Sequence, residues 1–236
     1  MKDWQKQLRE QEDRHDKPCK PQVVAGALGQ LLDDDAIIST DSGTITTWAA
    51  RHIPIKGRQM FSCSGNLATM APGLPYTIAA QIAYPDRQCV AFIGDGGLTM
   101  LMGELATAVK YELPITVVVI KNNTLGMIKW EQMVFLGNPE FGCELQPIDF
   151  AAVARACGAT GIRLEDPNQC GDVVAAALSA PGPVVVDALV DPHEPPMPPK
   201  IKPQQALHMA EALAKGEPER KGIIATLLED RIREMV

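Results

Sequence analysis

The stretch of sequence that decides the fold is CVAFIGDGGLTMLMGELATAVKYELPITVVVIKNNTLG, residues 89–126. It opens with a short apolar run that ends in glycines, and a segment with helical spacing of apolar residues follows. A second run, 114–120, is rich in β-branched residues and lies between Pro114 and the pair Asn122-Asn123, as is typical of a strand. The stretch therefore predicts a strand, a turn, one helix over residues 98–113, and a second strand.

The same alternation continues on both sides of this stretch. Apolar runs predict further strands at residues 36–40, 58–62, 161–165 and 183–190, and helical spacing predicts helices at residues 21–32, 73–84, 149–158 and 173–178. Alternating strands and helices indicate an α/β fold with a doubly wound, largely parallel sheet and helices on both faces. Ligands of such sheets bind beyond the carboxyl ends of the strands.

Changes in composition divide the chain into three parts. Residues 1–20 are polar and charged, and we interpret them as a linker or an exposed helix. Residues 21–190 form the predicted α/β domain. Residues 191–236 begin with a Pro-rich, extended stretch and continue with helices at 204–215 and 223–235. The polar face of the last helix mixes acidic and basic residues, so we expect its apolar face to pack against the protein rather than contact a membrane.

The bulk composition excludes several classes of function. A net charge of −7 disfavours a nucleic-acid partner, because it leaves no basic surplus for phosphate groups. None of the six cysteines forms a C-x-x-C pair, so zinc ribbons and iron–sulfur loops have no support. The chain opens with charged residues and has no long apolar run, which favours a cytoplasmic location.

The residues after the two central strands suit a metal–diphosphate site. The glycines of residues 94–97 permit close approach of the protein backbone to a ligand, but Asp95 would repel a phosphate unless a cation lies between them. A right-handed strand–helix–strand unit brings the ends of its two strands side by side. Asp95 and Asn122 could then share one Mg²⁺, with a backbone carbonyl after Asn122 as a third ligand. Taken alone, the glycine motif is more typical of an ordinary strand-to-helix turn, and the second strand is what favours a metal site.

Residues 94–126 resemble the G-D-G…N-N signature of thiamine-diphosphate enzymes, with the spacing of that family from Asp95 to Asn122 and on to Gly126. The resemblance covers about residues 21–190. It implies that Asp95, Asn122 and the carbonyl of Thr124 hold Mg²⁺. The turn at residues 41–46 takes the place of a family turn that touches the diphosphate, where Thr44 could donate through its hydroxyl. The implied cofactor-binding residues are Gly43, Thr44, Ile45, Ala68, Thr69, Met70, Asp95, Gly96, Gly97, Asn122, Thr124, Leu125, Gly126 and Met127.

Two side chains take roles in the chemistry that this resemblance implies. Met70, five residues before Pro75, matches the bulky apolar wedge that keeps the cofactor bent, although methionine also commonly fills gaps in a core. Glu131 in IKWEQ matches a glutamate of pyruvate oxidases that faces the reacting carbon, and it could move a proton to the substrate oxygen. A solvated helix glutamate is the alternative for Glu131.

The resemblance implies the thiamine-diphosphate- and Mg²⁺-binding part of a 2-oxoacid oxidase or decarboxylase, with pyruvate or a similar acid as substrate. In the family, an activating glutamate comes from a pyrimidine-binding domain, and the oxidases hold FAD in a middle domain. Residues 1–20 have no room for either. We therefore expect this chain to need a partner domain or subunit, to be a subunit or a piece of a longer chain, and to form homo- or hetero-oligomers.

Three alternatives stay open at this point. An acetolactate-synthase-like carboligase would use the same cofactor and attack a second carbonyl. A subunit of a ferredoxin-linked oxidoreductase is disfavoured by the missing cysteine pairs. A non-catalytic fragment that only binds the cofactor is the third, because the activating glutamate lies outside this sequence.

Overall fold

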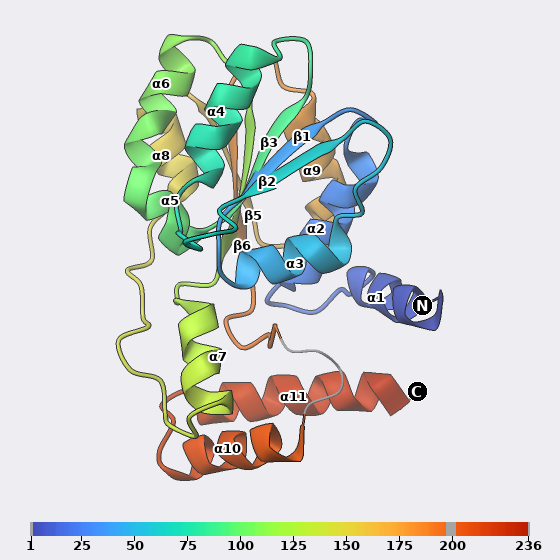
Figure 1. The fold of residues 1–236 in the computed structure, drawn as a ribbon, viewed down its shortest axis with the longest axis vertical. Helices are drawn as coiled ribbons and strands as arrows, with labels where there is room; N and C mark the ends of the chain where they lie inside the picture. The colour runs from blue at the N-terminus through green and yellow to red at the C-terminus, as the bar shows by residue number, and fades with distance from the viewer. Residues whose placement is uncertain (1, 197–201, 236) are drawn as a thin grey trace. The chain divides into compact units, whose positions relative to one another are not determined.

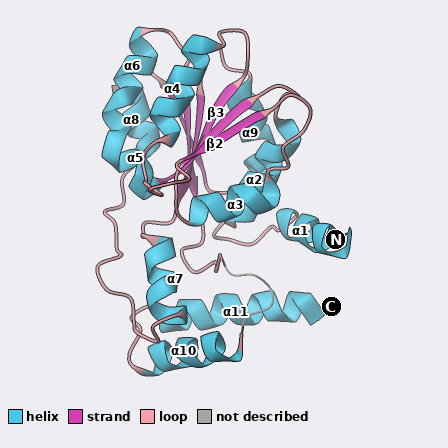
Figure 2. Ribbon diagram, viewed as in Figure 1, coloured by secondary structure: helices cyan, strands magenta, loops and turns pink. Residues whose placement is uncertain are grey.

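Six parallel strands form one sheet in the order β2-β1-β3-β4-β6-β5 within the part of the chain that the structure, a computed structural model, describes: residues 2–196 and 202–235 (Figures 1 and 2). Every neighbouring pair is parallel, so all six strands end at the same edge. The fold class predicted from the sequence is confirmed. The strands are β1 (Ile37–Thr40), β2 (Met60–Cys63), β3 (Cys89–Gly94), β4 (Thr116–Lys121), β5 (Thr160–Leu164) and β6 (Val184–Leu189).

Helices cover both faces of this sheet. The face that carries Val90 and Phe92 packs against α2 (Pro21–Leu31), α3 (Thr44–His52) and α9 (Cys170–Leu178). The face that carries Ala91 and Ile93 packs against the other layer of helices. That layer consists of α4 (Gly73–Ala83), α5 (Asp95–Leu101), α6 (Leu105–Lys110) and α8 (Phe150–Ala156). Successive side chains of a strand point to opposite faces, so each strand contributes to both layers, and each buried Val, Leu, Ile or Phe contributes about 1.5–3 kcal/mol.

The strand order reverses between β1 and β3, and this reversal positions the site. From β1 the chain turns through α3 on one face, and from β3 it turns through α5 and α6 on the other. The two connections diverge to opposite faces, and ligands of such sheets bind at the carboxyl edge beside this reversal. The segments that begin at Asp41 and at Asp95 therefore flank the reversal point.

The structure differs from the sequence-based expectation at two places. The single helix expected over 98–113 is wrong: α5 ends at Leu101, a 3₁₀ turn (Met102–Glu104) follows, and α6 begins at Leu105. Gly103 lies at the interruption, and glycine disfavours a helix interior. The helix α3 was not predicted from the sequence, because its first turn, Thr-Ile-Thr-Thr, consists of β-branched residues.

The chain divides into two compact units, and residues 123–146 belong with the C-terminal part rather than with the sheet. This second unit contains α7 (Gly126–Val134), α10 (Pro203–Ala214) and α11 (Arg220–Met235). Its core joins Trp130 and Met133 of α7 with Met209 of α10 and Ile223 of α11. The last helix thus packs one side against its own unit, as the sequence predicts.

Residues 1–20 include a helix, as the sequence suggests, and also buried residues. Residues 2–12 form a helix, α1 (Lys2–Glu12), and beyond it Cys19 and Lys20 are buried in the sheet-containing unit. Of the Pro-rich stretch, residues 197–201 lie outside the described part of the chain. Among the described residues, no helix is both long enough and apolar enough to cross a membrane.

Candidate functional site

The turn after β3 holds the first predicted metal ligand. We call Gly94–Gly97 the metal turn. Asp95 is the first residue of α5 and is buried, and its Oδ1 accepts a hydrogen bond from the N–H of Gly96 at 2.9 Å. The carboxylate is therefore held by its own turn.

Asn122 follows the neighbouring strand directly. In the parallel pair of β3 and β4, Gly94 lies opposite Ile120, so Asp95 and Asn122 each come just past the end of adjacent strands. A carboxylate oxygen and an amide oxygen at one sheet edge form a hard donor set that suits Mg²⁺. Asn122 is half-buried. Within the described residues, no cluster of three or more His, Cys, Asp or Glu side chains offers a different kind of metal site.

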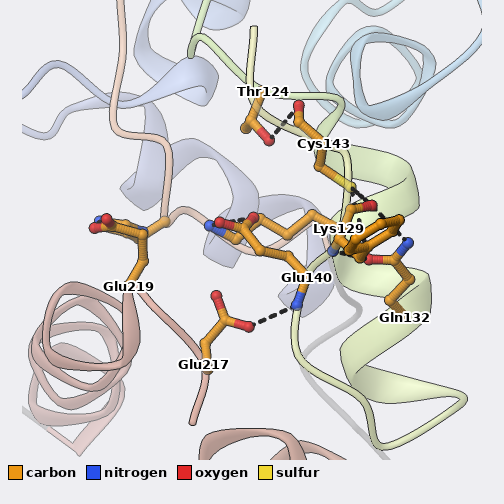
Figure 3. A network of polar contacts seen from close by, with 9 residues as sticks. Thr124, Lys129, Gln132, Glu140, Cys143, Glu217 and Glu219 are labelled. Atoms are coloured by element: carbon orange, nitrogen blue, oxygen red, sulfur yellow. Dashed lines mark hydrogen bonds and ion pairs between the residues drawn. The ribbon is translucent and has the colours of Figure 1, made fainter.

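Thr124, the third predicted ligand, belongs to the second unit and sits in a tightly held loop. Its carbonyl oxygen accepts a hydrogen bond from the N–H of Gly126 at 2.9 Å. The carbonyl oxygen of Cys143 accepts two hydrogen bonds, from the hydroxyl of Thr124 at 3.2 Å and from the N–H of Leu125 at 2.8 Å (Figure 3). The N–H of Leu145 also donates to the carbonyl of Asn123 at 2.9 Å. Residues 143–145 therefore fix the loop that carries the Thr124 carbonyl.

A network of polar contacts around residues 140–143 was not predicted from the sequence (Figure 3). Gln132 of α7 accepts from the N–H of Phe141 at 2.8 Å and donates to the carbonyl of the same residue at 3.1 Å. Lys129, which is only 2% exposed, forms an ion pair with Glu140 at 3.2 Å, and the N–H of Glu140 donates to Glu217 at 2.8 Å. Side chains of α7 and of the C-terminal part thus hold residues 140–143, which in turn hold the Thr124 loop.

Met70 lies in a loop with unusual backbone angles. We call residues 64–72 the wedge loop. Ala68 has a φ of 50° and Ala71 a φ of 80°, a left-handed conformation that disfavours side chains with a Cβ. Met70 lies between them and is half-buried, whereas Ala68 and Thr69 are exposed. Leu67 of the same loop is 93% exposed, so Met70 is the large apolar side chain of the loop that is partly covered, which is consistent with the predicted wedge.

The turn after β1 contacts the wedge loop directly. The N–H of Ser42 donates to the carbonyl of Thr69 at 3.3 Å, and the Ser42 hydroxyl donates to the carbonyl of Ser64 at 3.1 Å. Gly43 has a φ of 135°, and nothing lies within 4 Å of where its Cβ would be. The structure therefore brings together two of the predicted cofactor segments, residues 43–45 and 68–70.

Within residues 43–45, Thr44 and Ile45 differ in which atoms could contact a ligand. Thr44 begins α3 and is half-buried, so its hydroxyl remains a candidate donor. The Ile45 side chain is 3% exposed and packs in the core, so only its backbone could meet a ligand.

Asp41 is the residue that sequence reasoning treated only as part of a turn. It is 2% exposed, and its Oδ1 accepts a hydrogen bond from the N–H of Gly73 at 2.8 Å. Its Oδ2 is buried without a hydrogen-bond partner and lies against Gly97, where a Cβ would come within 1.8 Å of it. Burial raises the pKa of Asp41 to about 6, although the nearby N–H groups of Gly73 and Ala71 lower it. Asp41 thus joins the turn after β1, the wedge loop and the metal turn.

The raised pKa predicts a pH-dependent stability. The folded chain holds the Asp41 proton more tightly than the unfolded chain, in which the pKa is near 3.8. The bound proton therefore stabilises the folded chain. Its contribution to the free energy of unfolding is complete below pH 3.8 and is lost as the pH rises through 6, by roughly 3 kcal/mol in all. Asp41→Asn removes this titration. The free energy of unfolding of the variant relative to that of the wild-type chain should therefore increase by this amount between about pH 4 and pH 7.5. Urea unfolding at a series of pH values measures it, and a difference that stays flat would contradict the assignment.

The remaining predicted residues lie in the second unit, on or next to α7. Gly126 begins this helix, and Leu125 and Met127 are half-buried on either side of it. Glu131 is exposed on α7, one residue before Gln132 of the polar network. Its predicted role in proton transfer stays a prediction.

The comparisons with known proteins agree with this geometry. Residues 41–188 match the family described as "Thiamine pyrophosphate enzyme, C-terminal TPP binding domain". The chain is 43% identical over 215 residues to YdaP of Bacillus subtilis (strain 168), which is named as a thiamine pyrophosphate-containing protein, and the match covers 91% of this chain and 37% of that protein.

Two enzymes are also similar. Pyruvate oxidase of Lactiplantibacillus plantarum is 36% identical over 192 residues, which cover 80% of this chain and 32% of the enzyme. The acetolactate synthase isozyme 3 large subunit of Escherichia coli (strain K12) is 33% identical over 186 residues, which cover 75% and 32%. The chain spans about a third of the length of these relatives. With the G-D-G-G and N-N segments at the ends of adjacent strands and the family match across the sheet, this chain belongs to the thiamine pyrophosphate enzymes, as their C-terminal cofactor-binding domain.

Proposed function

We propose that this chain binds thiamine diphosphate through Mg²⁺ and forms the diphosphate-binding part of a pyruvate-oxidase-like 2-oxoacid oxidase or decarboxylase. The observation that carries the proposal is the placement of Asp95 and Asn122 directly after two paired parallel strands. Their oxygen atoms, with the Thr124 carbonyl, are a donor set that Mg²⁺ accepts. Negative charge from Asp95 and from a diphosphate is tolerable at one edge only with a cation between them.

The other residues would hold and orient the cofactor. Gly96 and Gly97 carry no side chain that would block the approach of the diphosphate, and Thr44 would donate its hydroxyl to it. Met70 would support the bent shape from the strained wedge loop. Glu131 would hold or deliver a proton at the substrate oxygen. When bound, thiamine diphosphate supplies the nucleophilic carbon and the electron sink that decarboxylation of a 2-oxoacid requires.

The proposal includes parts outside this chain. The domain bounds we propose are 21–190 for the cofactor-binding domain, with 1–20 as a connecting segment and 191–236 as a C-terminal extension. The chain spans about a third of the length of its relatives. This supports our proposal that a pyrimidine-binding domain or subunit comes from elsewhere and that FAD would be held outside this chain. An oligomer follows if the site forms between subunits.

A carboligase is the second candidate, and the acetolactate synthase relatives favour it. A chimera can separate the two activities: the part of the B. subtilis relative that this chain does not match is placed ahead of this chain. With pyruvate, thiamine diphosphate and Mg²⁺, we expect CO₂ release together with reduction of an artificial electron acceptor. Acetolactate formation without reduction of the acceptor would support the carboligase. A chimera that binds the cofactor but releases no CO₂ from any 2-oxoacid would contradict both.

The polar network of the second unit gives a prediction for metal affinity. Gln132→Ala should raise the Mg²⁺ concentration needed for half-maximal thiamine diphosphate binding about tenfold, because residues 141–143 would no longer hold the Thr124 loop. Gln205→Ala is the matched control, since it also removes a glutamine that accepts a backbone hydrogen bond in the same unit, from Lys202. Equal Mg²⁺ dependence of both variants would exclude this role for Gln132.

A further inference from the structure

We propose that Asp41 and Ser42 form a positioning pair that sets the wedge loop against the metal turn. The inference rests on the proposed function, because it explains how the two halves of that cofactor site keep their spacing. Both residues follow β1 directly, at the reversal point of the sheet. Neither is assigned to hold the metal, so the pair acts through the loops that it contacts.

The Asp41 carboxyl group fills a space that only glycines leave open. A Cβ at Gly97 would lie 1.8 Å from Oδ2 and 2.8 Å from Cγ of Asp41, and a Cβ at Gly73 would lie 3.1 Å from Oδ1. The carboxyl group therefore packs against the backbone of the metal turn on one side and against the start of α4 on the other. Its side chain cannot rotate away, because Oδ1 is held by the N–H of Gly73 and the group is buried.

The pair also holds the wedge loop at three points. Asp41 accepts from Gly73 directly after the loop, and Ser42 contacts Thr69 and Ser64 within it. Left-handed backbone at a residue with a Cβ persists only where the surroundings impose it. These three hydrogen bonds supply such a restraint on either side of Met70.

The stability of the fold does not by itself explain why a carboxyl group lies at this position. An acceptor that is buried without a partner disfavours the folded state, and Oδ2 of Asp41 is such an acceptor. An apolar side chain of similar size would avoid that penalty, but it would lose the hydrogen bond to Gly73 and the contact that spaces the metal turn. The arrangement is therefore explained by the geometry of the site that it maintains.

The test compares two ligands at saturating Mg²⁺: thiamine diphosphate and inorganic diphosphate. Inorganic diphosphate needs only the metal and its surroundings, whereas thiamine diphosphate also needs the wedge loop. The quantity measured is the dissociation constant of diphosphate divided by that of thiamine diphosphate. Loss of folded protein affects both constants equally, so this ratio reports the positioning of the loop rather than stability.

We expect Asp41→Ala to lower this ratio about tenfold and Ser42→Ala about threefold. Asp41→Asn keeps an acceptor for Gly73 and should restore the ratio to within about twofold of the unchanged chain. Thr116→Ala is the control, because it removes a buried hydrogen bond, to Ala177, at the opposite edge of the sheet. Its ratio should not change.

An unchanged ratio in Asp41→Ala would overturn the proposal, and so would an equal fall in Thr116→Ala. Should Asp41→Ala not fold, an unchanged ratio in the half-buried Ser42→Ala would overturn it as well. Failure of the wild-type protein to bind either ligand, both as this chain and in the chimera with the missing domains, would instead contradict the proposed function itself. The two failures are therefore distinguishable.

Discussion

Replacing Asp95 with asparagine should raise the Mg²⁺ concentration needed for thiamine diphosphate binding by about 100-fold. Asparagine has the same shape and keeps an oxygen for the N–H of Gly96, so the metal turn should retain its structure. What it loses is the negative charge, which strengthens the binding of a hard divalent cation. Titration of the cofactor at a series of Mg²⁺ concentrations measures the effect.

Asp86→Asn is the matched control for this change. Asp86 is exposed in the turn before β3, at the opposite end of the strand that Asp95 follows. Asp86→Asn should leave the Mg²⁺ dependence of cofactor binding the same as in the wild-type chain. If Asp95→Asn bound the cofactor at the same Mg²⁺ concentration as Asp86→Asn, the metal assignment would be wrong.

Gly97→Ala should lower the free energy of unfolding by about 2–3 kcal/mol and weaken cofactor binding with it. The new methyl group would meet the Asp41 carboxyl at 1.8 Å, and that carboxyl is buried and hydrogen-bonded. One of the two groups must move, and either movement displaces the metal turn from the wedge loop. Urea unfolding and cofactor titration of the same variant measure both effects.

A double-mutant cycle identifies the cause of this loss. In an Asp41→Ala background, the nearest neighbour of the new methyl group on this side becomes the backbone N of Ala71, at 3.5 Å, which is ordinary contact. Alanine is also favoured over glycine within a helix. Gly97→Ala should therefore be almost neutral there, which gives a coupling energy of about 2 kcal/mol. Additive losses would show that the two residues do not oppose each other.

Local sequence signals were sufficient for the centre of the sheet. The run 114–120 was predicted as a strand, and β4 occupies Thr116–Lys121, directly beside β3 as the right-handed connection requires. Because Asp95 and Asn122 follow these strands directly, their position at the same edge of the sheet follows from the topology. The metal candidates were thus accessible from the sequence together with the family resemblance.

A helix signal for α3 was present but was outweighed by residue type. The buried residues Ile45, Trp48, Ala49 and His52 follow helical spacing, yet the opening Thr-Ile-Thr-Thr favours an extended chain. Burial of the apolar face against the sheet overrides this local preference. Periodicity over the whole segment would have found the helix.

The roles of Asp41 and Lys129 could not be predicted from local sequence. Asp41 is defined by contacts with Gly73 and Gly97, which are 32 and 56 positions further along the chain. The burial of Lys129 depends on its ion pair with Glu140, on a loop that Glu217 holds in turn. Charged residues are rarely buried, so only the tertiary structure could show both.

The most direct test of the proposed cofactor site is a calorimetric titration of the purified chain with thiamine diphosphate, in Mg²⁺ and then in EDTA. We predict binding in Mg²⁺ that EDTA abolishes, because in the proposed site an ion held by Asp95, Asn122 and Thr124 would anchor the diphosphate. Binding of equal strength in EDTA, or no binding even in the chimera with the missing domains, would contradict the account.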